Sequence, residues 1–105
     1  MTMDEIVEAN RAAGKFFFDD ETMEKFDTKL IDETFDHVGG DRIYFVTNDR
    51  NHDDTERVFK VRVFSKASAS VWSPYIEGGS AAFDNEADAL ALAAKLAETP
   101  DKEEA

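Results

Sequence analysis

Apolar and polar positions alternate most regularly between residues 56 and 65. Phe59, Val61 and Val63 are separated there by charged residues. A period of two is typical of a β-strand that buries one face. The segment is therefore predicted to be a strand whose apolar side chains point toward the core and whose other face carries charge.

A glycine pair indicates a hairpin before that strand. Gly39-Gly40 separates residues 35–38 from the β-rich run 42–47, and such a pair between two strand-like segments favours antiparallel pairing. Residues 29–38 are ambiguous on their own, because a helix would give them a broad apolar face and a strand would give no clean alternation. We favour a strand for 29–38 because of the hairpin signal.

Helix signals come before these strands. Thr2 and Glu5 have the spacing of a capping box, which predicts a helix over 3–13 that stops at Gly14. A second helix is predicted over about 21–28, because the two aspartates before it can cap its N-terminus and acids there suit the helix dipole.

A final helix is predicted after Asp84 or Asn85, either of which can act as its cap. Thr99-Pro100 should end it, since proline rarely continues a helix. The expected buried stripe of this helix, read at helical spacing, consists of Ala87, Leu90, Ala91 and Ala94, with Leu96 near one edge.

A last edge strand is predicted from 71–72 together with 75–76, and Pro74 confines it to the edge of a sheet. These elements predict an α+β fold, in which a small antiparallel sheet of three or four strands packs against two or three helices. We expect one domain over 1–98 and a flexible acidic tail over 99–105.

The composition fits one modest core. The chain has 105 residues, of which 42% are hydrophobic, enough for a single domain. The run Phe16–Phe18 is expected to enter that core, because a domain this small needs its large residues inside. There is no cysteine, so disulfides and thiolate zinc sites are excluded. The absence of a signal peptide or a long apolar run favours a cytoplasmic protein with no membrane partner.

The charge narrows the choice of partner. The formal net charge is −12, and such a chain repels nucleic acid through its summed field. One interpretation is that the acids serve only solubility, and another is that they form a docking surface for a basic protein. The candidate partner-binding residues are Asp19, Asp20, Glu24, Asp27, Asp32, Glu33, Asp36, Asp49, Asp53 and Asp54, the last three in a loop predicted over 48–55.

The segment 57–66 has the opposite charge. It holds two arginines and two lysines and no acid. If Lys60 and Arg62 face acids on a neighbouring strand, they form cross-strand pairs, which is the interpretation we favour. If they stand free, they form a basic strip that could bind nucleic acid.

No catalytic or metal-binding motif is complete. Residues 49–53 resemble the start of a calcium loop, but Asp54 replaces the turn glycine and Lys60 replaces the final glutamate. His37 and His52 lie in different segments without the spacing of a two-histidine metal site. We therefore expect no metal, no cofactor and no enzymatic activity.

Several short runs resemble a family of small bacteriophage and mobile-element proteins. The runs are Ala9-Asn10 with Gly14 and Phe17-Phe18, then Glu21-Thr22-Met23, Tyr44-Phe45-Val46-Thr47 and Val61-Arg62-Val63-Phe64. They look structural, and the family is a domain of unknown function, so the resemblance transfers no active site. Asn48 stands where the family pattern would have serine.

The expected function combines this resemblance with the charge. We expect a non-enzymatic phage or prophage accessory protein that acts by protein–protein interaction through its acidic surface. Its sharpest form is a DNA mimic that inhibits a host defence or nucleic-acid-binding complex, because carboxylates can replace phosphates opposite lysine and arginine. The alternative is a small nucleic-acid-binding module that uses the basic segment 57–66.

Overall fold

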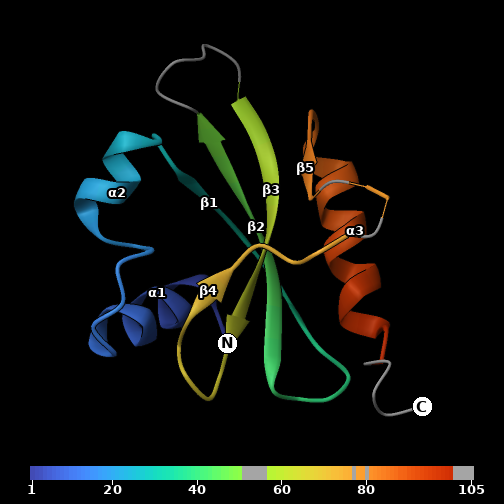
Figure 1. Cartoon of the computed structure of the whole chain (residues 1–105), viewed down its shortest axis with the longest axis horizontal. Coiled ribbons are helices and arrows are strands. Elements are labelled where there is room, and N and C mark those ends of the chain that lie inside the picture. Colours follow the sequence, from blue (N-terminus) through green and yellow to red (C-terminus); the bar gives the residue numbers. More distant parts are fainter. Residues whose placement is uncertain (51–56, 77, 80, 101–105) are drawn as a thin grey trace.

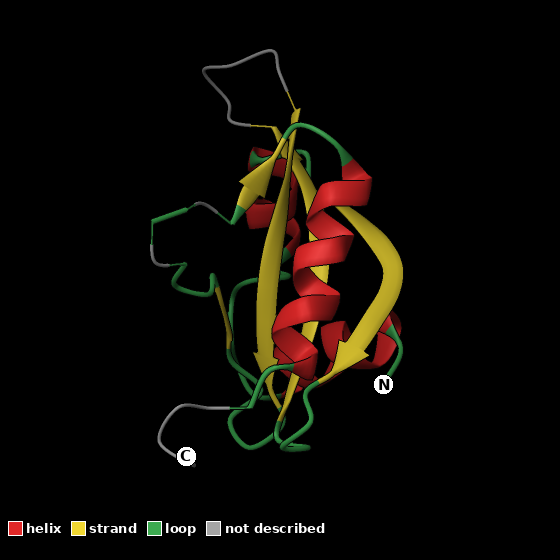
Figure 2. Cartoon of the chain, turned by 90° about the vertical axis from the view of Figure 1, so that its right-hand side faces the viewer, coloured by secondary structure: helices red, strands yellow, loops and turns green. Residues whose placement is uncertain are grey.

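An antiparallel sheet lies between two layers of helices (Figure 1 and Figure 2). This computed structural model describes residues 1–50, 57–76, 78–79 and 81–100. Helix α3 packs on one face of the sheet, and α1 and α2 lie on the opposite face. In chain order the elements are α1 (Met3–Ala12), α2 (Asp20–Lys25), β1 (Lys29–Asp36), β2 (Arg42–Arg50), β3 (Arg57–Ser65), β4 (Val71–Trp72), β5 (Ala82–Phe83) and α3 (Glu86–Glu98).

The sheet confirms the predicted α+β class. Its strand order is β1-β2-β3-β4, and β5 also pairs with β3. β4 pairs with residues 63–64 of β3, whereas β5 pairs with residues 59–60 of the same strand. The predicted strand over 29–38 is present as β1, which pairs antiparallel with β2. The two-residue strand β5 was not predicted.

The turn between β1 and β2 uses its second glycine for a left-handed conformation. Gly40 has φ +78°, a region that residues with a side chain rarely adopt. The His37 amide donates to the Arg42 carbonyl at 2.9 Å and closes the hairpin. The predicted hairpin is thereby confirmed.

The capping box of α1 is also confirmed. The Glu5 amide donates to Thr2 Oγ1 at 3.2 Å, and the Thr2 amide donates to Glu5 Oε1 at 2.8 Å. Gly14, with φ +75°, follows the end of the helix. Helix α2 is shorter than predicted, because the chain leaves the helical conformation at Asp27, where φ is +45°.

The core between α3 and the sheet is made by alanines. Ala89, Ala93 and Ala97 are buried against a sheet face whose buried residues are Tyr44, Val46, Val61 and Val63. The predicted stripe is wrong: Ala87 and Ala91 are exposed, and Leu90 and Ala94 are only half-buried. The series 89, 93 and 97 repeats every four residues, so methyl groups face the strands and the larger leucines flank the contact.

The core on the opposite face is built from larger side chains, namely Met3, Ile6, Phe18, Ile43, Phe45 and Phe64. The rings of Phe18 and Phe45 lie 6.1 Å apart. The run 16–18 enters this core only in part, because Phe16 is 76% exposed while Phe18 is fully buried. The Asp19 amide donates to the Phe16 carbonyl, so the run is a turn and its first ring points outward.

Two predicted boundaries change near the ends of strands. β2 continues through Arg50 and pairs with β3 over its last residues, so residues 48–50 are strand and not loop. Residues 51–56 lie outside the part of the chain that the structure describes. The predicted edge strand is shortened to β4, since Tyr75 is 87% exposed and unpaired in the sheet. Residues 101–105 of the predicted tail are also outside the described residues.

Candidate functional site

Four of the candidate acids on α2, its N-cap and β1 are both exposed and unpaired. They are Asp19, Glu24, Asp32 and Glu33, and none of them forms an ion pair with another described residue. Helix α2 leads directly into β1 (Figure 1), so both pairs lie on neighbouring elements. β1 is an edge strand of the sheet. The arrangement exposes uncompensated carboxylates at this edge of the molecule.

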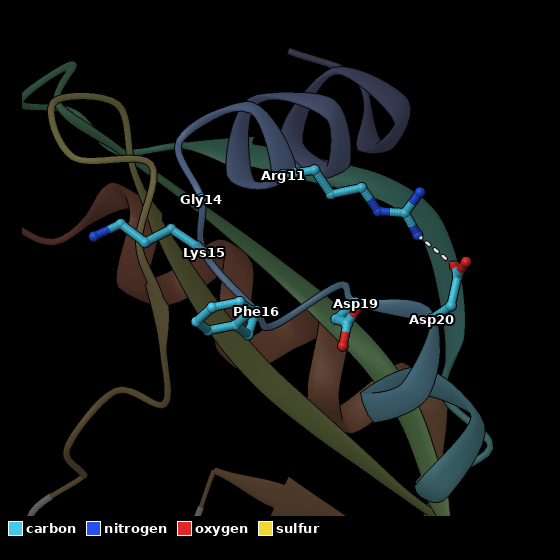
Figure 3. A pocket seen from close by; sticks show the side chains of 6 residues that line it. All are labelled: Arg11, Gly14, Lys15, Phe16, Asp19 and Asp20. Carbon is cyan, nitrogen blue, oxygen red and sulfur yellow. Dashed lines mark hydrogen bonds and ion pairs between the residues drawn. The ribbon is translucent and has the colours of Figure 1, made fainter.

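Asp20 and Asp19 border an open hollow of about 310 Å³ between α1 and α2. Arg11 NH2 donates to Asp20 Oδ1 at 3.0 Å, and Nε and NH2 of Arg11 also donate to the Phe18 carbonyl. Figure 3 shows this ion pair spanning from α1 to the start of α2, with the Lys15 side chain directed away from it. Arg11 therefore holds the turn between α1 and α2 in place, and its positive charge is compensated by Asp20.

Asp27 and Asp36 connect parts of the fold. The Asp27 carboxylate binds the Arg57 guanidinium and lies 3.9 Å from Arg50 NH2. Asp36 Oδ1 lies 3.8 Å from Lys66 Nζ. Both acids have cationic neighbours within the chain, unlike Asp19, Glu24, Asp32 and Glu33. Asp53 and Asp54 lie outside the described residues.

Asp49 was predicted to be an exposed acid in a loop, and this prediction is wrong. Only 3% of the residue is exposed, because β2 continues past it and its side chain falls on the face covered by α1 and α2. Its Oδ1 accepts a hydrogen bond from Thr28 Oγ1 at 2.8 Å. Its Oδ2 accepts from Thr47 Oγ1 at 3.2 Å and from Arg62 NH2 at 2.9 Å. Asp49 therefore does not belong to an exposed acidic surface.

Arg62 is held on all sides. Besides Asp49, its guanidinium donates through NH1 to Ser73 Oγ at 2.7 Å. Its Cζ lies 5.0 Å from the centre of the Phe17 ring, within the range of a cation–π contact. The side chain is only 15% exposed. The favoured expectation of a cross-strand pair is confirmed for Arg62, and its partner is Asp49 on β2.

A pocket of about 310 Å³ opens beside this ion pair. Its walls and floor come from the turn before α2, from α2 and its C-terminal loop, and from strands β2 and β3. The lining residues are the aromatic Phe17 and Phe26, the hydroxyl-bearing Thr22 and Thr28, and the charged Asp49, Lys60 and Arg62. The pocket therefore combines two aromatic rings with three charged side chains.

The basic segment of β3 is mostly paired. Arg57 binds Asp27, Arg62 binds Asp49, and Lys66 lies next to Asp36. Lys60 is the one cation of this segment without an ion pair among the described residues. The segment therefore offers a single unpaired cation and not a continuous strip.

His37 links the hairpin to the end of α3. It is 3% exposed, and Nδ1 accepts a hydrogen bond from the Gly39 amide at 3.0 Å. Nε2 consequently carries the proton and donates to the Thr99 carbonyl at 2.8 Å. Among the described residues, no group of three or more His, Asp or Glu side chains is placed to hold a metal ion. His37 therefore connects the β1–β2 hairpin to the residue that follows α3.

The pocket was not predicted from the sequence. Phe17 was expected to be a core residue, and Asp49 was assigned to a loop. The available signal was the period-two pattern of β3, which places Lys60 and Arg62 on one face. Finding their partner requires the register that sets Thr47 opposite Lys60. None of the described helices is both long and apolar enough to span a membrane.

Comparison with known protein families identifies the family of this chain. A model of a family of unknown function, DUF7447, matches residues 2–73, from the N-cap of α1 through β4. No curated protein and no solved structure matches the chain. The matched stretch contains the Asp49–Arg62 pair and the whole pocket beside it, whereas β5 and α3 lie beyond it. Since the match covers more than half of the chain, this protein belongs to the family of unknown function DUF7447.

Proposed function

We propose that this protein is a non-enzymatic interaction protein whose acidic surface docks on a basic surface of another protein. The surface is formed by the exposed acids of α2 and β1, with Asp19, Glu24, Asp32 and Glu33 at its centre. Opposite charge on the two partners would speed their encounter and fix their orientation.

The observation that supports the proposal is how the arginines of the chain are paired. Each of the five arginines forms an ion pair with an aspartate of the same chain. These pairs neutralise acids that stabilise the fold, such as Asp27 and Asp49. Asp19, Glu24, Asp32 and Glu33 have no such partner among the described residues. An external cationic surface could supply the missing charge.

The position of Asp32 and Glu33 indicates how such a partner would bind. Both lie on the edge strand β1, where the pairing with β2 shifts register between Leu30 and Thr34. Charges and bulges on an edge strand oppose the addition of another strand. Docking would therefore use side-chain carboxylates, and its affinity should fall as salt screens them.

The partner class that fits best is a basic protein that binds nucleic acid. Its lysines and arginines are spaced for phosphates, and carboxylates can occupy the same positions. This is the DNA-mimic form of the proposal. The resemblance to bacteriophage and mobile-element proteins gives it a setting, in which the protein would act in the cytoplasm of a host cell on a defence or nucleic-acid-binding complex.

The test combines affinity capture with two matched variants. Asp32→Lys with Glu33→Lys changes the net charge from −12 to −8, since two acids become two lysines. Asp84→Lys with Glu98→Lys makes the same change at exposed residues at the two ends of α3. Captured proteins are identified by mass spectrometry at low and high salt, and the leading one is purified for measurement of affinity and competition with DNA.

The proposal expects a basic nucleic-acid-binding partner that is released by high salt and by DNA. The β1 variant should lose about tenfold or more in affinity, and the α3 variant should lose much less. Equal loss in both variants would mean that only net charge matters. Full retention in the β1 variant, with the fold intact by circular dichroism, would refute this docking surface.

A further inference from the structure

The pocket beside the Asp49–Arg62 pair has a charge that differs from the rest of the molecule. It is bordered by one carboxylate, Asp49, and two cations, Lys60 and Arg62. The sum of these charges is +1 in a chain whose net charge is −12. Because all three groups line one hollow, a ligand bound there would contact them directly and would not contact the exposed acids of α2 and β1.

Asp49 and Arg62 have little capacity left for a ligand. Asp49 already accepts hydrogen bonds from Thr28, Thr47 and Arg62, and its side chain is 4% exposed. A cationic ligand would have to displace Arg62 or one of the hydroxyl donors to reach it. The buried pair therefore acts as a neutral floor, and a cation finds no free acceptor there.

Lys60 is the group that remains. It lines the pocket, and it has no ion pair among the described residues. It also borders an adjoining hollow of about 230 Å³ between β4 and β5, which shares Arg62 with the first one. Its ammonium group can donate three hydrogen bonds, so it supplies the pocket with one uncompensated positive charge.

The remaining walls are aromatic. Phe17 packs edge-on against Phe18, with 4.8 Å between ring centres, and this contact fixes its orientation. Phe26 lies just after α2, and its amide donates to the Thr22 carbonyl at 3.3 Å. Aromatic rings favour offset or edge contacts with another ring. Arg62 Cζ lies 5.0 Å from the centre of the Phe17 ring and Lys25 Nζ lies 5.6 Å from the centre of the Phe26 ring. A planar ring would therefore contact the parts of these two rings that the cations leave open.

We infer that this pocket binds a small planar aromatic molecule with a single negative charge, such as an aromatic monocarboxylate. The ring contacts Phe17 and Phe26, and the carboxylate binds the Lys60 ammonium. A cavity of about 150 Å³ holds one benzene ring, so the volume of about 310 Å³ suits a molecule of two fused rings. This inference does not depend on the acidic docking surface.

The acidic surface does not prevent such binding. Charges separated by more than a Debye length, about 8 Å at physiological salt, are largely screened from one another. The contact with Lys60 is made inside the pocket, where screening is weaker and a charge-assisted hydrogen bond is strong. Long-range repulsion would slow the approach of an anion at low salt and would matter little at 0.15 M.

The inference is tested on the full chain by NMR titration of backbone amides. The probes are 2-naphthoate and its neutral isostere 2-naphthamide. Naphthoate should shift the amides of Phe17, Thr28 and Lys60 with a Kd of about 1 mM or lower. Lys60→Met keeps the length of the side chain and removes the charge, so it should weaken naphthoate binding about tenfold or more.

Three controls make the result decisive. Lys95→Met removes one charge from an exposed position of α3 and should leave the Kd unchanged. Thr22→Leu should block the pocket, and thermal melts confirm that each variant is folded. The inference would be overturned if naphthamide bound as tightly as naphthoate, or if the amide shifts were centred away from the pocket. Full affinity for naphthoate in Lys60→Met would overturn it as well. A peptide ending in phenylalanine that binds more tightly than naphthoate would overturn the assignment to a free small molecule.

Discussion

Arg62 on β3 donates a hydrogen bond to Asp49 on β2 at 2.9 Å, and both side chains are shielded from solvent, with exposed fractions of 15% and 4%. Removal of one member of a buried pair leaves the other charge without compensation in a poorly solvated place. The pair is therefore expected to be critical for stability whatever its net contribution is.

Asp49→Ala should lower the free energy of unfolding by about 3 kcal/mol. The measurement is urea unfolding followed by circular dichroism. Asp32→Ala is the matched control, because Asp32 is exposed and unpaired among the described residues, and its effect should stay within about 0.5 kcal/mol. The double variant Asp49→Ala with Arg62→Met should recover part of the loss. Similar stability of Asp49→Ala and Asp32→Ala would contradict the buried pair.

The alanine contact of α3 allows a test of the helix face. Ala93 is fully buried and Ala91 is exposed, although they are two residues apart. Ala93→Leu inserts three carbons into a packed contact and should cost about 1–3 kcal/mol. Ala91→Leu adds the same carbons toward solvent and should change stability by less than about 0.5 kcal/mol. Thermal unfolding of the two variants decides which face is buried, and the reverse order would restore the stripe predicted from the sequence.

That mistaken stripe shows where sequence patterns are informative and where they are not. The period-two pattern of β3 and the glycine pair before β2 reveal the sheet, because backbone geometry alone dictates those signals. In α3 nine of the thirteen residues are alanine or leucine, so apolar residues lie on most sides of the helix and more than one stripe fits the sequence. The buried stripe is decided by the close approach that alanines permit, which is a tertiary effect.

The candidate site, like the fold, was predictable from the sequence only in part. Asp32 and Glu33 are exposed, as charged residues usually are. Asp49 looks the same in the sequence, yet the continuation of β2 carries it inside. Its partners Thr28 and Arg62 are distant along the chain, so only the strand register and the path after α2 bring them together. The pocket has no local motif for the same reason.

His37 is expected to hold the end of α3 against the β1–β2 hairpin. His37→Ala removes its bonds to the Thr99 carbonyl and the Gly39 amide, and should cost about 2 kcal/mol. The Val38 amide donates to the Ala97 carbonyl at 2.9 Å, so its hydrogen exchange should quicken. Thr99→Ala keeps the backbone carbonyl and should leave the Val38 amide protected. Unchanged exchange in His37→Ala would show that α3 is held by its alanines alone.

The capping box of α1 predicts a dependence on pH. The backbone N–H of Thr2, and then its hydroxyl, bind the Glu5 carboxylate and lower the pKa of Glu5 from its ordinary value of 4.5. A lowered pKa in the folded state means that the ionised group stabilises the fold above pH 4.5 and that this contribution disappears as the pH falls through the lowered value.

Glu5→Gln should therefore melt at a lower temperature than the natural protein at pH 7, and the gap should narrow as the pH falls below 4.5 and through the lowered pKa of Glu5, because the carboxylate of the natural protein then becomes protonated. Glu8→Gln removes the same charge from an exposed position of α1 without removing a cap, and should leave stability at pH 7 within about 0.5 kcal/mol of the natural protein. A gap for Glu5→Gln that stays constant between pH 7 and pH 3 would mean that the box acts through shape and not through the charge of its carboxylate.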